Sequence, residues 1–286
     1  MPSLIDIRRR IRSVKNTQQI TKAMKMVSAA KLRRAQDRVL ASRPYAALLR
    51  KVLGNVAAAG AADENAGQNP LLARRGENRL LLVLITADKG LAGAFNTNLT
   101  KTAQRFLGER NAASVTLELI GRKGRDFFRR RHRKISGEQV GLATKPAYED
   151  MAAIARKAME MFRSEEIDAV YLLYNEFKSV ATQKLTLARV LPAELPEQDA
   201  PTDYIFEQPP AEMLDSLLPR YVEMEFYRAL LESAAAEHAA RLTAMDSATS
   251  NAAEMIDKLT LYMNRVRQAS ITKEIIEVVS GAAAAE

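Results

Sequence analysis

The chain has 286 residues, of which 47% are hydrophobic and 27% are charged, and this composition is typical of a folded protein with one or two domains. It contains no cysteine, which excludes disulfides, thiolate catalysis and cysteine-based zinc sites, and its two histidines, His132 and His238, lie in no metal-binding motif. No segment approaches the roughly 20 apolar residues that cross a bilayer, and a formal net charge of +9 indicates an acidic partner.

Residues 1–56 predict one long helix, in which Pro44 is the one proline between residues 4 and 56. Positions spaced alternately by three and four form the a/d frame of a coiled coil, which is apolar at both ends and polar between residues 18 and 28. Residues 1–54 hold fourteen lysines and arginines but only two aspartates, a formal charge of +12. The frame consists of Leu4, Ile7, Ile11, Val14, Gln18, Thr21, Lys25, Ser28, Leu32, Ala35, Val39, Ser42, Ala46, Leu49, Leu53 and Val56.

Residues 211–286 predict a second long helix with the same alternation, and residues 211–280 carry a formal charge of −4. Helices of this length need a partner, and the opposite charges favour the two ends of the chain as partners in one antiparallel coiled coil. The polar stretches of the two frames, at Gln18–Ser28 and His238–Arg241, have two interpretations. They indicate either loose packing or a rod whose sides also contact another protein. The second frame consists of Met224, Tyr227, Leu231, Ala234, His238, Arg241, Met245, Ala248, Ala252, Met255, Leu259, Tyr262, Val266 and Ala269.

The middle of the chain, residues 79–190, predicts a small Rossmann-like α/β domain. Apolar runs at 79–86 and 114–120 are typical of buried strands, and each is followed by a helix, at about 96–108 and 121–131. A third helix fits 148–164, and the runs 167–174 and 180–190 read as strands of a hairpin. This order favours a mainly parallel sheet, flanked by linkers at 57–78 and 191–210.

Two glycine-rich turns in this domain, ADKGLAGAFN (87–96) and GRKG (121–124), follow predicted strands and precede predicted helices. Neither matches a dinucleotide or P-loop fingerprint, so we interpret both as tight turns that need glycine. The sequence shows no carboxylate pair, catalytic triad or metal-ligand cluster. We therefore expect no catalytic residue, no cofactor and no metal.

A basic cluster, RKGRDFFRRRHRK (122–134), leaves a different function open. It fits nucleic acid or another anionic surface, although a solvated helix face is the more ordinary reading. A coiled-coil adaptor that binds nucleic acid is therefore the alternative function. The complete lack of tryptophan and the few aromatic residues in the long helices weaken it.

The C-terminal segment 268–281 is unusually apolar for an exposed helix end, and its apolar residues lie on more than one face. Such an end would leave an apolar patch in water unless it docks in an apolar sleeve or folds back. We expect it to dock.

Four stretches resemble the gamma subunit of F-type ATP synthases, and in order they span almost the whole chain. They are RIRSVKNTQQITKAMKMVSAAKLRRAQ (10–36), ITADKGLAGAFNTN (85–98), EHAARLTAMDSATSNA (237–252) and RQASITKEIIEVVSGA (267–282). The resemblance implies a non-catalytic rotor shaft that couples proton-driven rotation of the c-subunit ring to the conformational cycle of the catalytic beta subunits. Because no presequence is evident, it also implies a bacterial protein, peripheral on the cytoplasmic face of the plasma membrane.

The resemblance also implies partners and contact residues. The partners are the alpha and beta subunits of the catalytic head, the epsilon subunit and the c-ring, with no nucleic acid and with membrane association only through the complex. By matching motif, the beta-subunit contacts are Met24, Lys25, Arg267, Gln268 and Thr272. The c-ring and epsilon contacts are Tyr204, Ile205, Phe206 and Glu207, where the match is looser.

Overall fold

The computed structural model describes residues 3–60, 69–110, 114–131, 133–195 and 208–283. Their contacts divide the chain into two compact units. We call residues 3–28 with 242–283 the coil unit and residues 29–241 the sheet unit. The elements in chain order are α1 (Leu4–Gly60), η2 (Pro70–Leu72), β1 (Leu80–Ile85), α2 (Phe95–Glu109), β2 (Val115–Ile120), α3 (Arg122–Arg129), β3 (Ile135–Gln139), α4 (Tyr148–Arg163), β4 (Ala169–Phe177), β5 (Gln183–Leu191) and α5 (Pro210–Ala283).

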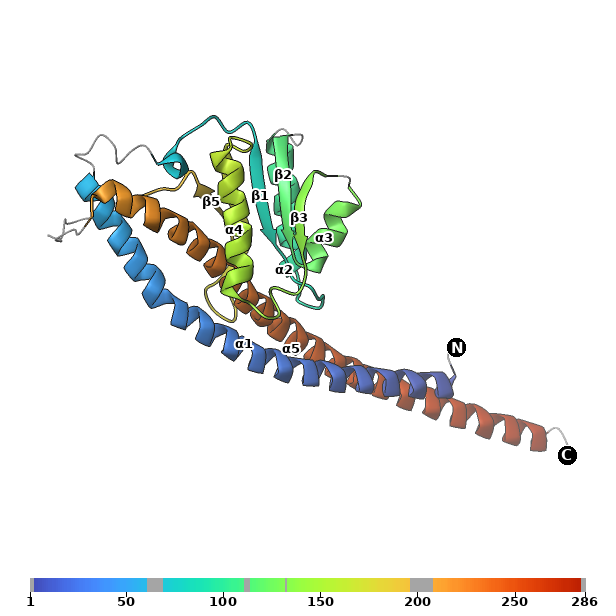
Figure 1. The fold of residues 1–286 in the computed structure, drawn as a ribbon. Coiled ribbons are helices and arrows are strands. Elements are labelled where there is room, and N and C mark those ends of the chain that lie inside the picture. The colour runs from blue at the N-terminus through green and yellow to red at the C-terminus, as the bar shows by residue number, and fades with distance from the viewer. Residues whose placement is uncertain (1–2, 61–68, 111–113, 132, 196–207, 284–286) are drawn as a thin grey trace. The chain divides into compact units, whose positions relative to one another are not determined.

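The sheet unit is built on five strands in the order β3-β2-β1-β4-β5 (Figure 1). The first four strands in this order pair in parallel, and β5 returns antiparallel to β4 as the predicted hairpin. Every residue of β1 and β2 is buried, as expected for parallel strands that are covered on both faces. The predicted α/β fold with a mainly parallel sheet is confirmed.

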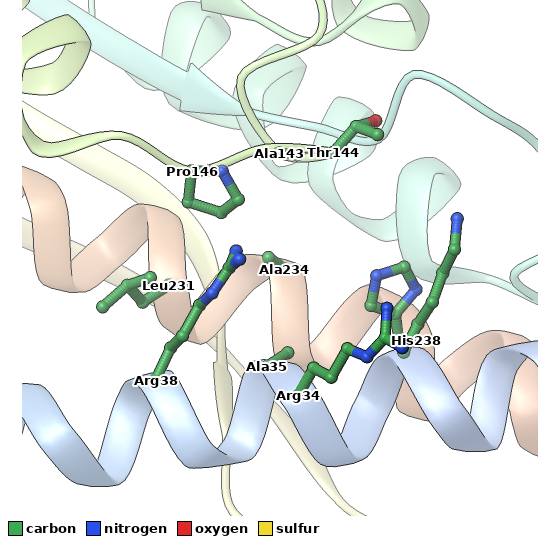
Figure 2. Close-up of a pocket in the computed structure, with 10 residues that line it drawn as sticks. Arg34, Ala35, Arg38, Ala143, Thr144, Pro146, Leu231, Ala234 and His238 are labelled. Atoms are coloured by element: carbon green, nitrogen blue, oxygen red, sulfur yellow. The ribbon is translucent and has the colours of Figure 1, made fainter.

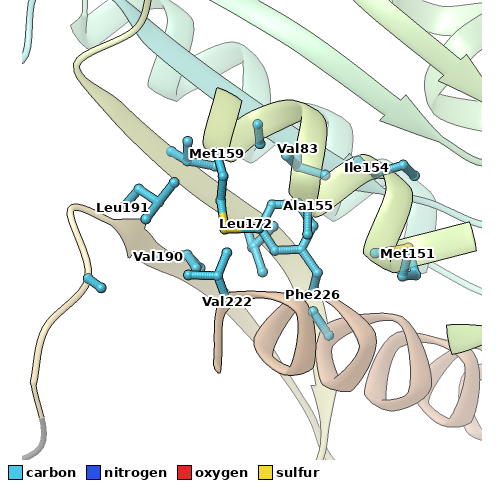
Figure 3. Packing of buried hydrophobic residues seen from close by; sticks show 14 of the residues in the cluster. Val83, Met151, Ile154, Ala155, Met159, Leu172, Val190, Leu191, Val222 and Phe226 are labelled. Carbon is cyan, nitrogen blue, oxygen red and sulfur yellow. The ribbon is translucent and has the colours of Figure 1, made fainter. Parts of the chain in front are cut away.

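Alternate residues of the strands point to two separate apolar cores. Leu81, Val83 and Leu172 face one core, which they share with α4, with the beginning of α5 and with Leu53 and Val56 of α1. Figure 3 shows this core, with Val222 and Phe226 of α5 packed close to strand and α4 residues. The opposite face of the sheet packs on α2 and α3. Both long helices therefore take part in the core of the sheet unit.

Strand β3 was not predicted, because its sequence, ISGEQ, carries no apolar signal. It is a short edge strand whose residues are half-buried or exposed, and it pairs with β2 across a register shift at Leu117/Glu118. Gly137 in this strand lies against the buried Glu118 carboxylate, where a Cβ would come within 2.3 Å of Oε1. Pairing with its neighbour, not its own composition, makes this segment a strand.

The GRKG turn needs its glycines for steric reasons. Gly121 has φ +94°, and a Cβ there would lie 2.0 Å from the carbonyl oxygen of Thr86. Gly124 packs on the same threonine, whose hydroxyl donates to Ile120 O and accepts from the Gly124 N–H. The turn holds β1, β2 and α3 together through one buried side chain.

The two long helices pair antiparallel within each unit. In the sheet unit, Arg43 and Arg50 of α1 form ion pairs with Glu232 and Glu225 of α5. All sixteen positions of the predicted a/d frame of α1 are buried or half-buried. The predicted coiled coil of the two ends is confirmed, and so is the frame of its first helix.

Beyond Ala252, the predicted frame of α5 is wrong at every second position. Met255 and Tyr262, assigned to the seam, are 45% and 42% exposed, and Ala269 is exposed as well. The half-buried positions are Ile256, Met263 and Ser270, one residue later in each case. Both frames alternate three and four and both hold apolar residues, so the packing against α1 decides between them.

Candidate functional site

Between Thr21 and Ser28 of α1, polar contacts join the two helices of the coil unit in addition to buried apolar residues such as Met245. The hydroxyl groups of Thr21 and Thr249 share a hydrogen bond with 2.8 Å between the oxygens. One turn further along, Lys25 Nζ lies 2.5 Å from Asp246 Oδ1. Together with the buried Ser28, these residues occupy the polar stretch of the α1 frame. That stretch is therefore a paired seam of small and polar residues.

Two of the predicted contact residues, Met24 and Lys25, lie beside this seam. Met24 is half-buried, and the Lys25 side chain is 43% exposed although its ammonium group is paired with Asp246. An exposed ion pair of this kind stabilises by no more than about 1 kcal/mol, so it leaves the lysine able to exchange partners.

Most of the positive charge of α1 in the coil unit is unpaired. Among the described residues, Lys25 is the single cation of α1 residues 4–28 that forms an ion pair. The exposed cations without an ion-pair partner are Arg8, Arg9, Arg10, Arg12, Lys15 and Lys22. Attraction between the two ends therefore uses little of this charge, and the helix presents a basic surface.

The last part of α5 has no partner on α1. The contacts Thr21–Thr249 and Lys25–Asp246 set a register that places Leu4, the beginning of α1, level with about residue 266. The remainder of α5 extends beyond the end of α1 (Figure 1). The predicted contact residues Arg267, Gln268 and Thr272 lie in this extension, and all three are exposed.

The extension is apolar as well as unpaired. Ile271 is 49% exposed, Ile276 is 58% exposed and Val278 is 72% exposed, and Ile275 and Val279 are comparable. These five exposed apolar side chains, gathered within nine residues of one helix, are unusual for a surface that only meets water. We call residues 267–280 the apolar tip.

The other predicted contact residues, Tyr204, Ile205, Phe206 and Glu207, lie outside the described residues. Within the described parts of the chain, no group of three or more His, Cys, Asp or Glu side chains could hold a metal ion. No helix in those parts has an apolar stretch long enough to cross a membrane.

In the sheet unit, Arg241 joins α5 to the loop between β1 and α2, although the sequence predicted it only as a position of the a/d frame. Its guanidinium group bonds the carbonyl oxygen of Gly90 through Nε and Nη2, at 3.4 and 3.3 Å. Nη2 also pairs with Glu237 at 2.6 Å, and both side chains are only 10% exposed. A buried ion pair that also bonds a loop carbonyl ties the long helix to the sheet.

Two titratable groups of α5 are perturbed in this region. Burial, with smaller contributions from the charges of Arg241 and Lys31, lowers the pKa of His238 to about 4, so the ring is neutral at pH 7. Burial raises the pKa of Glu237, and the attraction of Arg241 partly offsets that effect. The polar residues of the predicted α5 frame, His238 and Arg241, therefore belong to a largely buried polar network with Glu237 inside the sheet unit.

The basic cluster on α3 uses its aromatic residues internally. Phe128 is fully buried in the core, and Phe127 is covered by the guanidinium group of Arg131, 3.6 Å from the ring centroid. Two of its arginines, Arg125 and Arg129, form ion pairs with acids of the same unit. Neither phenylalanine presents the free ring that stacks on a nucleic-acid base.

Comparison with known proteins accounts for nearly the whole chain. The family described as ATP synthase matches residues 3–285. The ATP synthase gamma chain of Solibacter usitatus is 80% identical, with full coverage of both chains, and that of an Anaeromyxobacter species is 54% identical over 99% of each chain. The fold is similar to a chain in the mitochondrial ATP synthase of Euglena gracilis in a complex of OSCP, F1 and c-ring, with a TM-score of 0.67, 20% identity and coverage of 98% and 94%.

A full-length match at this identity leaves no segment of the chain outside the family, and it gives no support to a nucleic-acid adaptor. The antiparallel helix pair and the five-stranded α/β domain agree with that similarity in fold. This chain belongs to the family of ATP synthase gamma chains.

Proposed function

We propose that this chain is the central rotor shaft of an F-type ATP synthase. In this role it couples proton-driven rotation of the c-ring to the conformational cycle of the catalytic beta subunits, and it catalyses nothing itself. The observation that carries the proposal is the 80% identity to an ATP synthase gamma chain over the full length of both chains. The comparable structure of a mitochondrial synthase, which holds F1 and a c-ring, supports the same assembly.

A shaft of this kind works by unequal contacts. A rotating element biases its neighbours only if its contact free energy differs between their conformational states. The coil unit supplies two different surfaces, because α1 is basic and mostly unpaired while the end of α5 is apolar. Exposed charge contacts of modest strength suit a surface that must release each partner in turn.

We assign the beta-subunit contacts to Met24, Lys25, Arg267, Gln268 and Thr272. Their exposure supports the assignment for the three residues of the apolar tip, and the exchangeable pair with Asp246 supports it for Lys25. The apolar tip docks in an apolar sleeve of the alpha and beta subunits. Tyr204, Ile205, Phe206 and Glu207 are assigned to the c-ring and epsilon subunit by motif alone.

The proposal includes a division of labour along the chain. Residues 1–56 and 211–286 form the shaft, residues 79–190 form the α/β domain, and residues 57–78 and 191–210 are linkers. The complex places the chain on the cytoplasmic face of a bacterial plasma membrane, where its partners alone attach it.

The test is purification of the complex from native membranes through a tag on this chain. We expect alpha, beta, delta, epsilon and c subunits to co-purify, and we expect the complex to pump protons with ATP. The isolated chain should have no ATPase activity. Purification without the catalytic subunits, or turnover of ATP by the isolated chain, would contradict the proposal.

A further inference from the structure

The sheet unit contains a cavity of about 140 Å³ that the shaft function does not use. Figure 2 shows it between α1, α5 and the loop that follows β3, with Arg38 pointing toward Pro146 of that loop and Arg34 toward His238 of α5. Its lining is polar on the α1 side and mostly apolar elsewhere. The lining residues are Lys31, Arg34, Ala35, Arg38, Ala143, Thr144, Pro146, Leu231, Ala234 and His238.

Three cations of α1 gather on this one cavity. Lys31, Arg34 and Arg38 follow the spacing of three and four that places helix residues on a common face. None of the three has an ion-pair partner among the described residues. The lining is therefore positively charged, because it holds three cations and no carboxylate.

Two acidic groups close to lining residues, Glu237 beside Lys31 and Asp88 beside Thr144, are engaged elsewhere. Glu237 pairs with Arg241. Asp88 accepts hydrogen bonds from the backbone N–H groups of Arg122 and Gly141. Neither carboxylate lines the cavity, so its three cations are free to bind an anion from outside the chain.

His238 adds a neutral donor to this lining. Nη1 of Arg241 lies 3.4 Å from His238 Nδ1, and a guanidinium group can only donate, so Nδ1 accepts and Nε2 carries the proton. The low pKa of His238 keeps the ring uncharged at neutral pH. Leu231 and Ala234 form a buried apolar wall, which lowers the local dielectric and strengthens charged hydrogen bonds.

The size of the cavity limits the ligand. An engineered protein cavity of roughly 150 Å³ holds one benzene molecule, whereas sites for drug-sized ligands span about 300–1,000 Å³. A whole nucleotide is therefore too large, and a single tetrahedral oxyanion is of suitable size. Guanidinium groups form paired hydrogen bonds with such oxygens, which carboxylates and phosphates both offer.

We propose that this pocket binds a small oxyanion of the phosphate class, held by Arg34, Arg38 and Lys31. The bound anion joins α1 to α5 and to the loop at Thr144, and so stabilises the sheet unit. Because the three cations are exposed on one side, the dissociation constant should be on the order of 1 mM. The inference is independent of the rotor function, since it concerns the chain by itself.

The experiment is titration of the full-length chain with sodium phosphate, followed by calorimetry and by thermal unfolding, against sodium chloride at equal ionic strength. A ligand at about 20 times its dissociation constant should raise the Tm by about 3 °C. Arg34→Gln with Arg38→Gln should weaken phosphate binding at least tenfold. The matched control is Arg8→Gln with Arg12→Gln, which removes two exposed arginines of the same spacing from the same helix and should bind phosphate normally.

ADP and acetate arms identify the anion. If phosphate binds at least as tightly as ADP, the ligand is a free oxyanion. If ADP binds more tightly, the ligand is the phosphoryl group of a nucleotide, and the rest of that nucleotide lies outside the cavity. Acetate binding as tight as phosphate would overturn the phosphate class. The site itself would be overturned if phosphate raised the Tm no more than chloride does. It would also be overturned if the Arg34/Arg38 and Arg8/Arg12 double variants lost the same amount of phosphate affinity.

Discussion

Thr21 and Thr249 meet across the two helices of the coil unit, with 2.8 Å between their hydroxyl oxygens, although 228 positions separate them in sequence. Small paired side chains at this point let the helices approach closely, and the contact sets the register of the coil. This register leaves the end of α5 without a partner on α1, which is why Arg267 is exposed.

Cysteines at these two positions should therefore form a disulfide. Thr21→Cys with Thr249→Cys places two thiols at the separation that a crosslink needs, and the natural chain has no cysteine to compete. We expect near-complete crosslinking under mild oxidation, seen as a mobility shift on a non-reducing gel. Thr21→Cys with Ile256→Cys, two turns out of register, should remain reduced, and crosslinking of both pairs alike would refute the register.

Arg267→Ala with Gln268→Ala should uncouple the assembled synthase without harming the fold. Both side chains are exposed, and neither has a hydrogen-bond or ion-pair partner among the described residues, so the free energy of unfolding should change by less than about 0.5 kcal/mol. We expect ATP-driven proton pumping in membrane vesicles to fall severalfold. Arg265→Ala, an exposed arginine two residues earlier, is the control that should pump normally. Normal pumping by the double variant would count against the assigned contact.

Gly121→Ala should destabilise the sheet unit strongly. Its φ of +94° is unfavourable for alanine, and the added Cβ would overlap the Thr86 carbonyl at 2.0 Å. We expect a loss of about 3 kcal/mol or more in urea unfolding. Gly108→Ala is the matched control, because it lies in α2 with no atom within 4 Å of its Cβ position, and helix propensity favours alanine there by up to about 1 kcal/mol. Similar effects of the two substitutions would contradict this account of the turn.

His238 should make the sheet unit sensitive to acid. Its pKa is about 4 in the folded chain, against an ordinary value of 6.5, so burial of the neutral ring stabilises the fold fully above pH 6.5. That contribution is lost as the pH falls from 6.5 towards 4, because the unfolded chain takes up the proton first. His238→Gln should therefore lose less free energy of unfolding between pH 7.5 and pH 5 than the natural chain does. Equal losses, measured by urea unfolding at both pH values, would show that the histidine is not perturbed.

The sequence by itself determined the types of the main elements and the seam of α1. Apart from Gln18 and Lys25, that helix has apolar or small residues on one face and most of its charges elsewhere, so a period near 3.5 was readable without a partner. The strands β1 and β2 were equally clear, because burial on both faces demands unbroken apolar runs. The family resemblance also rested on local motifs, and the comparisons confirm it.

Only the tertiary structure decided the seam of α5, the strand β3 and the cavity at Arg34. Adjacent apolar residues such as Met255 and Ile256 satisfy two frames equally well, and only the packed partner selects one. The edge strand has no apolar pattern of its own, because one side of it meets no neighbouring strand. Lys31 and His238 line one cavity although about 200 positions separate them in sequence. Local periodicity cannot predict such a contact, because only the folding of the whole chain brings the two residues together.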